Sequence, residues 1–269
     1  MRTDGYAAPT QGATMKAGAT AFPKDVNIQA GAPPARYSNG TTATTTPRAS
    51  LGDGQVERLA EQLRHRTLSP YERFAKPVID RAAAAILLIL LSPALIAIGL
   101  GIRLAMGRPV LFGQRRAGHG GAPFTMLKFR TMLLDRRLRN VPVLPECDRR
   151  VTHKSRSDPR HTTLGRWLRK TSLDELPQLI HVLRGQMSLV GPRPELIALV
   201  NDYAPWQQTR HIVKPGVTGL WQTTERGDGR MLHECTRLDL EYIANISLRL
   251  DLLILLRTPF ALLRNKGVI

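Results

Sequence analysis

Two adjacent carboxylates, Asp174 and Glu175, are the side chains whose position in this sequence indicates chemistry most clearly. They lie early in the stretch Thr171–Pro194, which reads T-S-L-D-E-L-P-Q-L-I-H-V-L-R-G-Q-M-S-L-V-G-P-R-P. Pro177 is tolerated in a first helical turn, and Gly185 is a suitable helix stop. The apolar residues between them follow the i, i+3, i+4, i+7 spacing of one helix face: Leu176, Leu179, Ile180 and Leu183. The pattern places the two carboxylates at a helix N-terminus.

Cations flank this pair on both sides in the sequence. A helix N-terminus gathers unpaired N–H groups and the positive end of the helix dipole, so it can hold a phosphate. Arg166, Arg169 and Lys170 precede the pair at spacings that bring them together on one helical side, and Arg193 follows in a stiff P-R-P. Like charges so placed repel unless an anion lies between them. A carboxylate pair among cations suits a phosphorylated substrate, with a divalent metal.

A second interpretation of the pair is structural. Ser172 to Glu175 matches a capping box, S-x-x-E, and Asp174 could itself be the N-cap. A cap residue can also bind a ligand, so the two interpretations are compatible.

Four motifs occur together in one order: K-F-R-T-M, T-S-L-D-E-L-P-Q-L, M-S-L-V-G-P-R-P-E and K-P-G-V-T-G-L-W-Q. Over residues 74–269 they resemble the bacterial sugar transferase family, the monotopic polyprenyl-phosphate phosphoglycosyl transferases. The resemblance implies a catalytic dyad with Mg²⁺ at Asp174 and Glu175. It implies transfer of a sugar-1-phosphate from a UDP-sugar to polyprenyl (undecaprenyl) phosphate, which releases a nucleoside monophosphate and begins exopolysaccharide or other glycoconjugate synthesis.

The resemblance also implies roles and surroundings. Asp174 is expected to be the nucleophile, and Glu175 a metal ligand or a base for the incoming lipid phosphate. The candidate phosphate binders are Arg169, Arg193, Lys128 and Lys214. The expected location is the cytoplasmic face of the bacterial inner membrane, in contact with its lipid, and downstream glycosyltransferases are candidate partners.

Composition agrees with an anionic partner. The 269 residues carry a formal net charge of +18, and residues 108–170 hold 16 Lys/Arg against 4 Asp/Glu. Such a surface attracts nucleic acid, nucleotide phosphates or anionic lipid. Aromatic residues are only 5 %, a poor supply for base stacking, and no nucleic-acid motif is present. A membrane-tethered nucleic-acid binder, a scaffold without catalysis and a multi-span transferase remain the competing interpretations.

The apolar run from Ala82 to Ile102 is long enough to cross a bilayer. Ser92-Pro93 lies at its middle, where proline removes a backbone donor and bends a helix, and both flanks are basic. A single kinked span and a re-entrant hairpin both fit, and the resemblance favours the hairpin. The family usually has Lys-Arg before this run, whereas Lys76 is followed here by Pro77, with Asp80 three residues later.

Residues 109–132 predict a β-hairpin with a glycine-rich turn. Lys128 and Arg130 alternate with apolar neighbours and so share one face, either solvated or, by resemblance, close to the active site. Residues 133–157 are expected to be a variable insertion. The G-H-G-G in the turn is not a dinucleotide fingerprint, since no G-x-G-x-x-G and no helix follow.

Beyond Pro194, residues 195–207 predict a helix, and Pro215, Gly216 and Gly219 form a turn beside Lys214 whose N–H groups could hold an anion. Glu225 replaces a glycine usual in the family. Residues 238–269 predict an amphipathic helix in the membrane interface, with a buried core helix as the alternative.

The expected fold is α+β and helix-rich, with a re-entrant helix hairpin, a small β-hairpin and interfacial amphipathic helices. The expected organisation is a disordered extension over 1–69, a membrane helix region over 70–107 and a catalytic domain over 108–269. Within the extension, residues 55–66 could form a short polar helix, and no signal peptide follows Met1. Cys147 and Cys235 carry no disulfide framework, which is typical of a reducing compartment.

Overall fold

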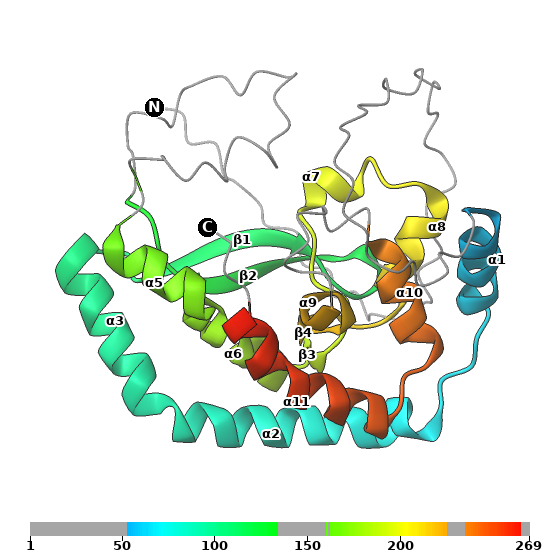
Figure 1. The fold of residues 1–269 in the computed structure, drawn as a ribbon, viewed down its shortest axis with the longest axis horizontal. Helices are drawn as coiled ribbons and strands as arrows, with labels where there is room; N and C mark the ends of the chain where they lie inside the picture. The colour runs from blue at the N-terminus through cyan, green and yellow to red at the C-terminus, as the bar shows by residue number, and fades with distance from the viewer. Residues whose placement is uncertain (1–52, 134–159, 161, 225–234, 265–269) are drawn as a thin grey trace, which may run out of the picture. The chain divides into compact units, whose positions relative to one another are not determined.

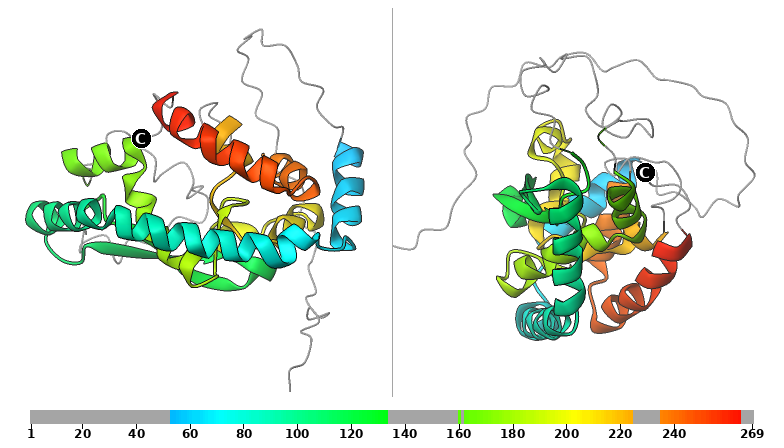
Figure 2. Two further views of the ribbon diagram at one scale, coloured as in Figure 1. Left: turned by 90° about the horizontal axis from the view of Figure 1, so that it is seen from below. Right: turned by 90° about the vertical axis from the view of Figure 1, so that its left-hand side faces the viewer.

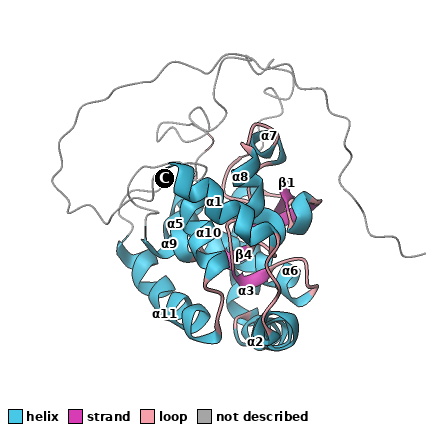
Figure 3. Cartoon of the chain, turned by 90° about the vertical axis from the view of Figure 1, so that its right-hand side faces the viewer, coloured by secondary structure: helices cyan, strands magenta, loops and turns pink. Residues whose placement is uncertain are grey.

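The computed structural model describes residues 53–133, 160, 162–224 and 235–264. Helices predominate, with two short pairs of strands among them, which confirms the α+β, helix-rich expectation (Figure 3). Most of the extension, nearly all of the expected insertion and Glu225 lie outside the described residues.

A bent pair of helices forms one side of the fold (Figure 1). A π-helical turn, η1 (Tyr71–Ala75), continues into α2 (Lys76–Leu90), and α3 (Ser92–Met106) follows after Leu91. The pair, Tyr71–Leu90 and Ser92–Met106, is bent by 62° at this break. Pro93 cannot donate a backbone hydrogen bond, and the Ser92 hydroxyl donates to the Ile89 carbonyl at 2.8 Å, so the break falls where the sequence predicted it. No single helix among those described is long and apolar enough to cross a membrane, and only the two helices of this bent pair taken together reach that length and composition.

The outer faces of this pair carry many exposed apolar side chains: Val78, Ile79, Ile86, Leu87, Ile89, Leu90, Ile96, Leu100 and Leu104. The inner faces pack on the rest of the protein through Ala84 and Ile102, both fully buried. Contiguous apolar surface of this kind marks an interaction with membrane or protein.

The predicted hairpin is confirmed. β1 (Leu111–Ala117) and β2 (Pro123–Phe129) are antiparallel, with Leu111 opposite Phe129, and a 3₁₀ turn, η2 (His119–Gly121), joins them. Lys128 and Arg130 do not share a solvated face. The Arg130 guanidinium donates to the carbonyls of Arg108, at 3.0 Å, of Gly107, at 2.7 Å, and of Met106. It therefore caps the C-terminus of α3, whose last carbonyls lack helical partners.

Two three-residue strands, β3 (Ser188–Val190) and β4 (Gly216–Thr218), pair in parallel at the centre of the main core. A Cβ at Gly216 would lie 2.1 Å from the Gly191 nitrogen, so only glycine permits this approach. The Gly216 N–H donates to the Pro192 carbonyl at 2.8 Å. The close approach at Gly216 brings G-P-R-P against β4. The sequence predicted that the Gly216 N–H could bind an anion, but this N–H is already used by the Pro192 carbonyl.

Buried side chains from both ends of the described chain contribute to the core around these strands. α1 (Asp53–Arg64) contributes Val56, Ala60 and Leu63, and packs on α10 (Thr236–Ala244). The predicted short helix is confirmed, and its apolar side chains are buried in this core. Cys235, just before α10, is buried as expected of a structural cysteine.

The described helices between β2 and α10 are short. They are α5 (Thr163–Thr171), η4 (Leu173–Gln178), α6 (Leu179–Leu183), α7 (Ile197–Val200), α8 (Pro205–Gln208), η5 (Thr209–Ile212) and α9 (Leu220–Thr224). The helix predicted over 195–207 is interrupted, because Ala204 precedes Pro205 and is extended, with φ −59° and ψ 153°.

The last helix, α11 (Leu248–Arg264), begins beside the start of α2 (Figures 1 and 2). Its Asp251 is buried and accepts from Lys76 at 2.6 Å, from the Tyr71 hydroxyl at 2.8 Å and from the Tyr242 hydroxyl at 2.8 Å. The opposite face exposes Leu252, Leu253, Leu256 and Phe260. α11 is amphipathic as predicted, and Lys76 serves to join it to α2. The stretch predicted as one helix over 238–269 is divided, however, because its first part belongs to α10, which is largely buried.

Candidate active site

The two carboxylates lie in η4, directly after α5. Ser172 ends α5 in the left-handed conformation, with φ 56°, and its N–H donates to the Arg169 carbonyl at 3.1 Å. Because Ser172 serves as this C-cap, its side chain does not cap η4, and the predicted capping box is absent. Asp174 and Glu175 are only 9 % and 8 % exposed, so their carboxylates point into the protein.

The predicted helix after the pair exists in two parts, since η4 is 3₁₀-helical and α6 is α-helical. Three residues per turn in the first part rotate the buried face away from the predicted one. Leu179 is buried as expected, but Leu183 is 43 % exposed and Val182 is buried in its place. Gly185 ends the helix with φ 76°, as predicted.

His181 on α6 fixes this segment against the hairpin. Its Nε2 accepts from the Leu127 N–H at 3.0 Å, which leaves Nδ1 to donate to Gln186 Oε1 at 2.8 Å. Phe124 packs edge-on against the imidazole, with ring centroids 5.5 Å apart. The imidazole thus positions Lys128, one residue beyond Leu127, next to the carboxylates.

Glu175 is bound by two cations from different parts of the chain. Arg193 Nη1 and Nη2 donate to its two carboxylate oxygens at 3.2 and 2.5 Å, and Lys128 Nζ lies 3.3 Å from Oε1. The paired fork geometry is among the strongest that a carboxylate forms. Sequence separations of 47 and 18 residues are closed here by the hairpin and by the P-R-P segment.

Asp174 differs from its neighbour. Its carboxylate takes part in no hydrogen bond or ion pair with the part of the chain that the structure describes. Burial and the negative charge of Glu175 raise the pKa of Asp174 to about 6, while the charges of Lys128, Arg193 and Arg169 oppose the rise. The group is therefore ionised at neutral pH and has oxygens available for a substrate or metal.

The other predicted phosphate binders divide into two places. Arg169 on α5 lies near the carboxylates, where its charge lowers the pKa of Asp174, and its Nε donates to Thr131 Oγ1 at 2.8 Å. Lys214 is not brought to this cluster, because it lines a separate cavity beside α2. Asp174, Glu175, Lys128, Arg169 and Arg193 form the candidate site, which we call the dyad site.

Sequence reasoning missed Arg116 on β1. Its guanidinium donates to Gln114 Oε1 at 2.7 Å and to the Pro194 carbonyl at 3.1 Å, and lies 3.5 Å from Glu195. Burial, and then the charge of Arg193, lower the pKa of Arg116 to about 10. The alternation of a strand puts only one of Arg115 and Arg116 on the inner face, but the sequence does not say which.

Arg210 on η5 was also missed. It is almost fully buried, with Nη2 2.7 Å from the Asp239 carboxylate, and it donates to the Tyr203 hydroxyl at 2.9 Å and to the Arg193 carbonyl at 2.8 Å. Together with the contact of Arg116 at Pro194, this fixes the backbone of P-R-P. The Arg193 side chain is thereby held toward Glu175.

Among the described residues, the dyad site offers a divalent metal only part of a ligand set. The described residues contain no group of three His, Cys, Asp or Glu side chains arranged to hold a metal. Mg²⁺ is commonly held by one or two carboxylates together with substrate phosphates and water, and the uncommitted Asp174 carboxylate can supply one such ligand.

Comparison with known proteins agrees with this geometry. The family model described as Bacterial sugar transferase matches residues 71–265. The chain is 39 % identical over 210 residues to the exopolysaccharide production protein ExoY of Rhizobium meliloti, covering 74 % of this chain and 89 % of that protein.

Two further relatives carry the name UDP-glucose:undecaprenyl-phosphate glucose-1-phosphate transferase. The protein of Caulobacter vibrioides is 42 % identical over 199 residues, 71 % of either chain. That of Escherichia coli is 40 % identical over 207 residues, 74 % of this chain but only 42 % of the relative. The chain thus spans less than half of the latter.

Proposed function

Because the chain belongs to the bacterial sugar transferase family, we propose that it transfers a sugar-1-phosphate from a UDP-sugar to undecaprenyl phosphate. The products are an undecaprenyl-diphosphate-linked sugar and UMP, which makes this the initiating step of exopolysaccharide or related glycoconjugate synthesis. The observation that carries the proposal is the buried dyad site, where one carboxylate is bound by two cations and the other remains available. The names of the relatives from E. coli and C. vibrioides support the same donor and acceptor.

The reaction proceeds in two displacements at one phosphorus. A carboxylate oxygen of Asp174 attacks the sugar-bearing phosphorus, the bond to the bridging oxygen breaks, and UMP leaves with that electron pair. An acyl phosphate then joins Asp174 to the sugar phosphate. An oxygen of undecaprenyl phosphate attacks the same phosphorus and restores the carboxylate. Covalent catalysis of this kind replaces one hard displacement by two easier ones.

The surrounding cations stabilise the charge that develops at the phosphorus. Arg193 and Lys128 are already oriented by Glu175, so little reorganisation is needed when the diphosphate binds. Arg169 adds a third positive charge close enough to lower the pKa of Asp174. Asp174 and Glu175 are the proposed ligands of Mg²⁺, which supplies further neutralisation of the diphosphate when bound.

The lipid acceptor requires the site to lie at a membrane surface. We place α2 and α3 in the cytoplasmic leaflet of the inner membrane as a re-entrant hairpin, with α11 in the interface. The 62° bend, the exposed apolar faces and the basic residues Arg81 and Arg103 at both ends support this placement.

Cysteine labelling tests the topology. Single cysteines introduced near residues 60 and 110 should react with an impermeant reagent from the same, cytoplasmic, side of sealed vesicles. Labelling from opposite sides would establish a spanning helix and defeat the hairpin.

The experiment that tests the function is a panel of UDP-sugars with the purified protein, Mg²⁺ and undecaprenyl phosphate, scored for UMP release and for the lipid product. One sugar should be turned over repeatedly. The same donor without the lipid should release about one UMP per protein and add the mass of one sugar phosphate. A protein that consumes no nucleotide sugar, or that releases UMP without any lipid-linked product, would contradict the proposal.

A further inference from the structure

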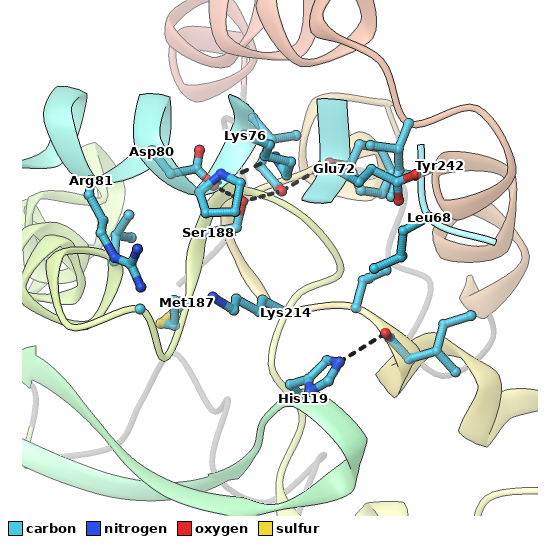
Figure 4. A pocket seen from close by; sticks show the side chains of 17 residues that line it. Leu68, Glu72, Lys76, Asp80, Arg81, His119, Met187, Ser188, Lys214 and Tyr242 are labelled. Atoms are coloured by element: carbon cyan, nitrogen blue, oxygen red, sulfur yellow. Dashed lines mark hydrogen bonds and ion pairs between the residues drawn. The ribbon is translucent and has the colours of Figure 1, made fainter. Parts of the chain in front are cut away.

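A cavity of about 140 Å³ lies beside the first turns of α2, apart from the dyad site (Figure 4). Its walls come from α2, the turn between β1 and β2, β3, and the segment from Ile212 to Lys214. None of the five dyad-site residues lines it. We call it the α2 cavity.

Three Lys and Arg side chains line the α2 cavity. Lys76 is paired with Asp251 at 2.6 Å, which leaves Arg81 and Lys214. Figure 4 shows the Lys214 side chain extending toward the side of the cavity where the Arg81 guanidinium lies. Within the described residues, neither side chain forms a hydrogen bond or an ion pair. A Cβ at Gly185 would lie 2.5 Å from Arg81 Nη2, so the guanidinium packs directly against the Gly185 backbone. Two cations are thus held at one cavity without a bound counter-charge.

The carboxylates near this cavity are engaged with other groups. Asp80 accepts from the Ser188 hydroxyl at 2.6 Å and lies 3.8 Å from Lys76. Glu72 accepts from the Ser69 hydroxyl at 3.0 Å and forms an ion pair with Arg66. Burial and then the charge of Arg81 lower the pKa of Lys214, and Asp80 offsets this only in part. An added anion between Arg81 and Lys214 would relieve their repulsion.

The remaining wall favours an amphiphilic anion over a free nucleotide. It is built mainly from apolar side chains, among them Leu68, Val182, Met187, Ile212 and Ile246. Leu68 is 55 % exposed, so apolar surface continues outward from the cavity. A phosphate with an attached hydrocarbon chain satisfies both the cations and this wall.

We propose that Arg81 and Lys214 bind the phosphate group of a membrane lipid in the α2 cavity, as a site separate from the dyad site. The inference rests on the proposed membrane position of α2, which brings the cavity to the depth of lipid phosphates. Two sources carry this chemistry, a glycerophospholipid of the bilayer and the prenyl phosphate itself.

The test measures binding to the full-length protein in a neutral detergent free of phosphate. The probes are dihexanoyl phosphatidylglycerol, farnesyl phosphate and inorganic phosphate, titrated by calorimetry in the absence of nucleotide sugar. Arg81→Gln and Lys214→Gln should each weaken binding of a lipid probe roughly tenfold or more, as expected when a charge-assisted hydrogen bond is lost. Arg249→Gln, which removes an exposed arginine of α11 away from the cavity, is the matched control and should bind normally.

The pattern of results identifies the source. A loss confined to dihexanoyl phosphatidylglycerol assigns the site to bilayer phospholipid, and a loss confined to farnesyl phosphate assigns it to the prenyl carrier. Unchanged lipid binding in the double variant that carries both Arg81→Gln and Lys214→Gln would overturn the inference. An equal loss in Arg249→Gln, or binding of inorganic phosphate with no preference for either lipid, would also overturn it. UMP release without acceptor is scored on the same wild-type protein, so a failed lipid site and a failed transferase are distinguishable.

Discussion

The dyad site and the α2 cavity both gather basic side chains, but they differ in how that charge is balanced. At the dyad site, Arg193 and Lys128 contact Glu175 directly. At the α2 cavity, Arg81 and Lys214 contact no carboxylate of the described chain. Internally paired cations hold a fixed geometry and suit a charge that changes during a reaction. Cations without internal partners suit an anion that stays and completes the charge balance.

The largest expected effect is that of Asp174→Asn. The change keeps the size of the side chain and removes the nucleophile, since an amide attacks phosphorus poorly and binds metal weakly. Turnover should fall by about a thousandfold or more, and the covalent adduct should disappear from the mass spectrum. Thermal unfolding of the variant provides the control for folding. An Asp174→Asn protein that still forms the adduct would remove Asp174 from the role of nucleophile.

Arg193→Ala should slow turnover about a hundredfold, because loss of one preorganised charge at a developing anion costs on the order of 3 kcal/mol. Arg169→Ala should have a smaller effect of tens-fold, since the charge of Arg169 acts less strongly on Asp174 than the charges of Lys128 and Arg193. Rates of UMP release on the same donor measure both. Near-normal rates in both variants, with folding intact, would mean that these cations do not stabilise the reaction.

The pH dependence follows from the raised pKa of Asp174, about 6. The ionised form is the nucleophile, so the rate of adduct formation should fall about fivefold between pH 6 and pH 5. The stability of the folded protein depends on pH in the opposite direction to this rate. The folded protein holds this proton more tightly than the unfolded chain, so the contribution of Asp174 to stability is lost as pH rises from about 4 through 6.

Arg169→Ala also sharpens the pH test. The charge of Arg169 lowers the pKa of Asp174. Removal of Arg169 should therefore move the acid limb, the fall in rate on the acidic side of the pH–rate profile, to higher pH. Arg249→Ala, remote from the site, should leave the limb in place. An acid limb that is identical in wild type and Arg169→Ala would contradict the assignment of the limb to Asp174.

The smallest expected effect is that of Arg81→Gln on UMP release without acceptor. Because Arg81 lines only the α2 cavity, the rate of this half-reaction should change less than twofold. Rapid-quench measurement of UMP beside Arg193→Ala compares the two cation clusters in one assay. A loss with Arg81→Gln as large as that with Arg193→Ala would erase the distinction between them.

Features encoded by nearby residues were predictable from the sequence. The break at Ser92-Pro93, the hairpin and the stop at Gly185 each follow from the local conformational preferences of proline, strand formers and glycine. Ser172 shows the limit of such reasoning. S-x-x-E predicts a capping box, but Ser172 is the C-cap of α5 and adopts the left-handed conformation.

Pairing between distant charges was not predictable. Arg130 has the same local pattern as Lys128, yet it binds the carbonyls at the end of α3, while Lys128 reaches Glu175. Lys214 is in a family motif but lies at the α2 cavity. Which cation meets which acid depends on how far-apart segments pack, and that is set by the whole core.

The strand β2 has a consequence for the carrier lipid. It contacts Glu175 through Lys128, and two residues later the chain contacts the end of α3 through Arg130. An extended chain rises about 3.3 Å per residue, so these two contacts are about 7 Å apart along it. With α3 in the bilayer as proposed, this short rigid link sets the height of the nucleophile above the hydrocarbon. A carrier must present its phosphate at that height, whatever the length of its tail. The enzyme would thus select prenyl lipids by the depth of their headgroup and tolerate variation in the number of isoprene units.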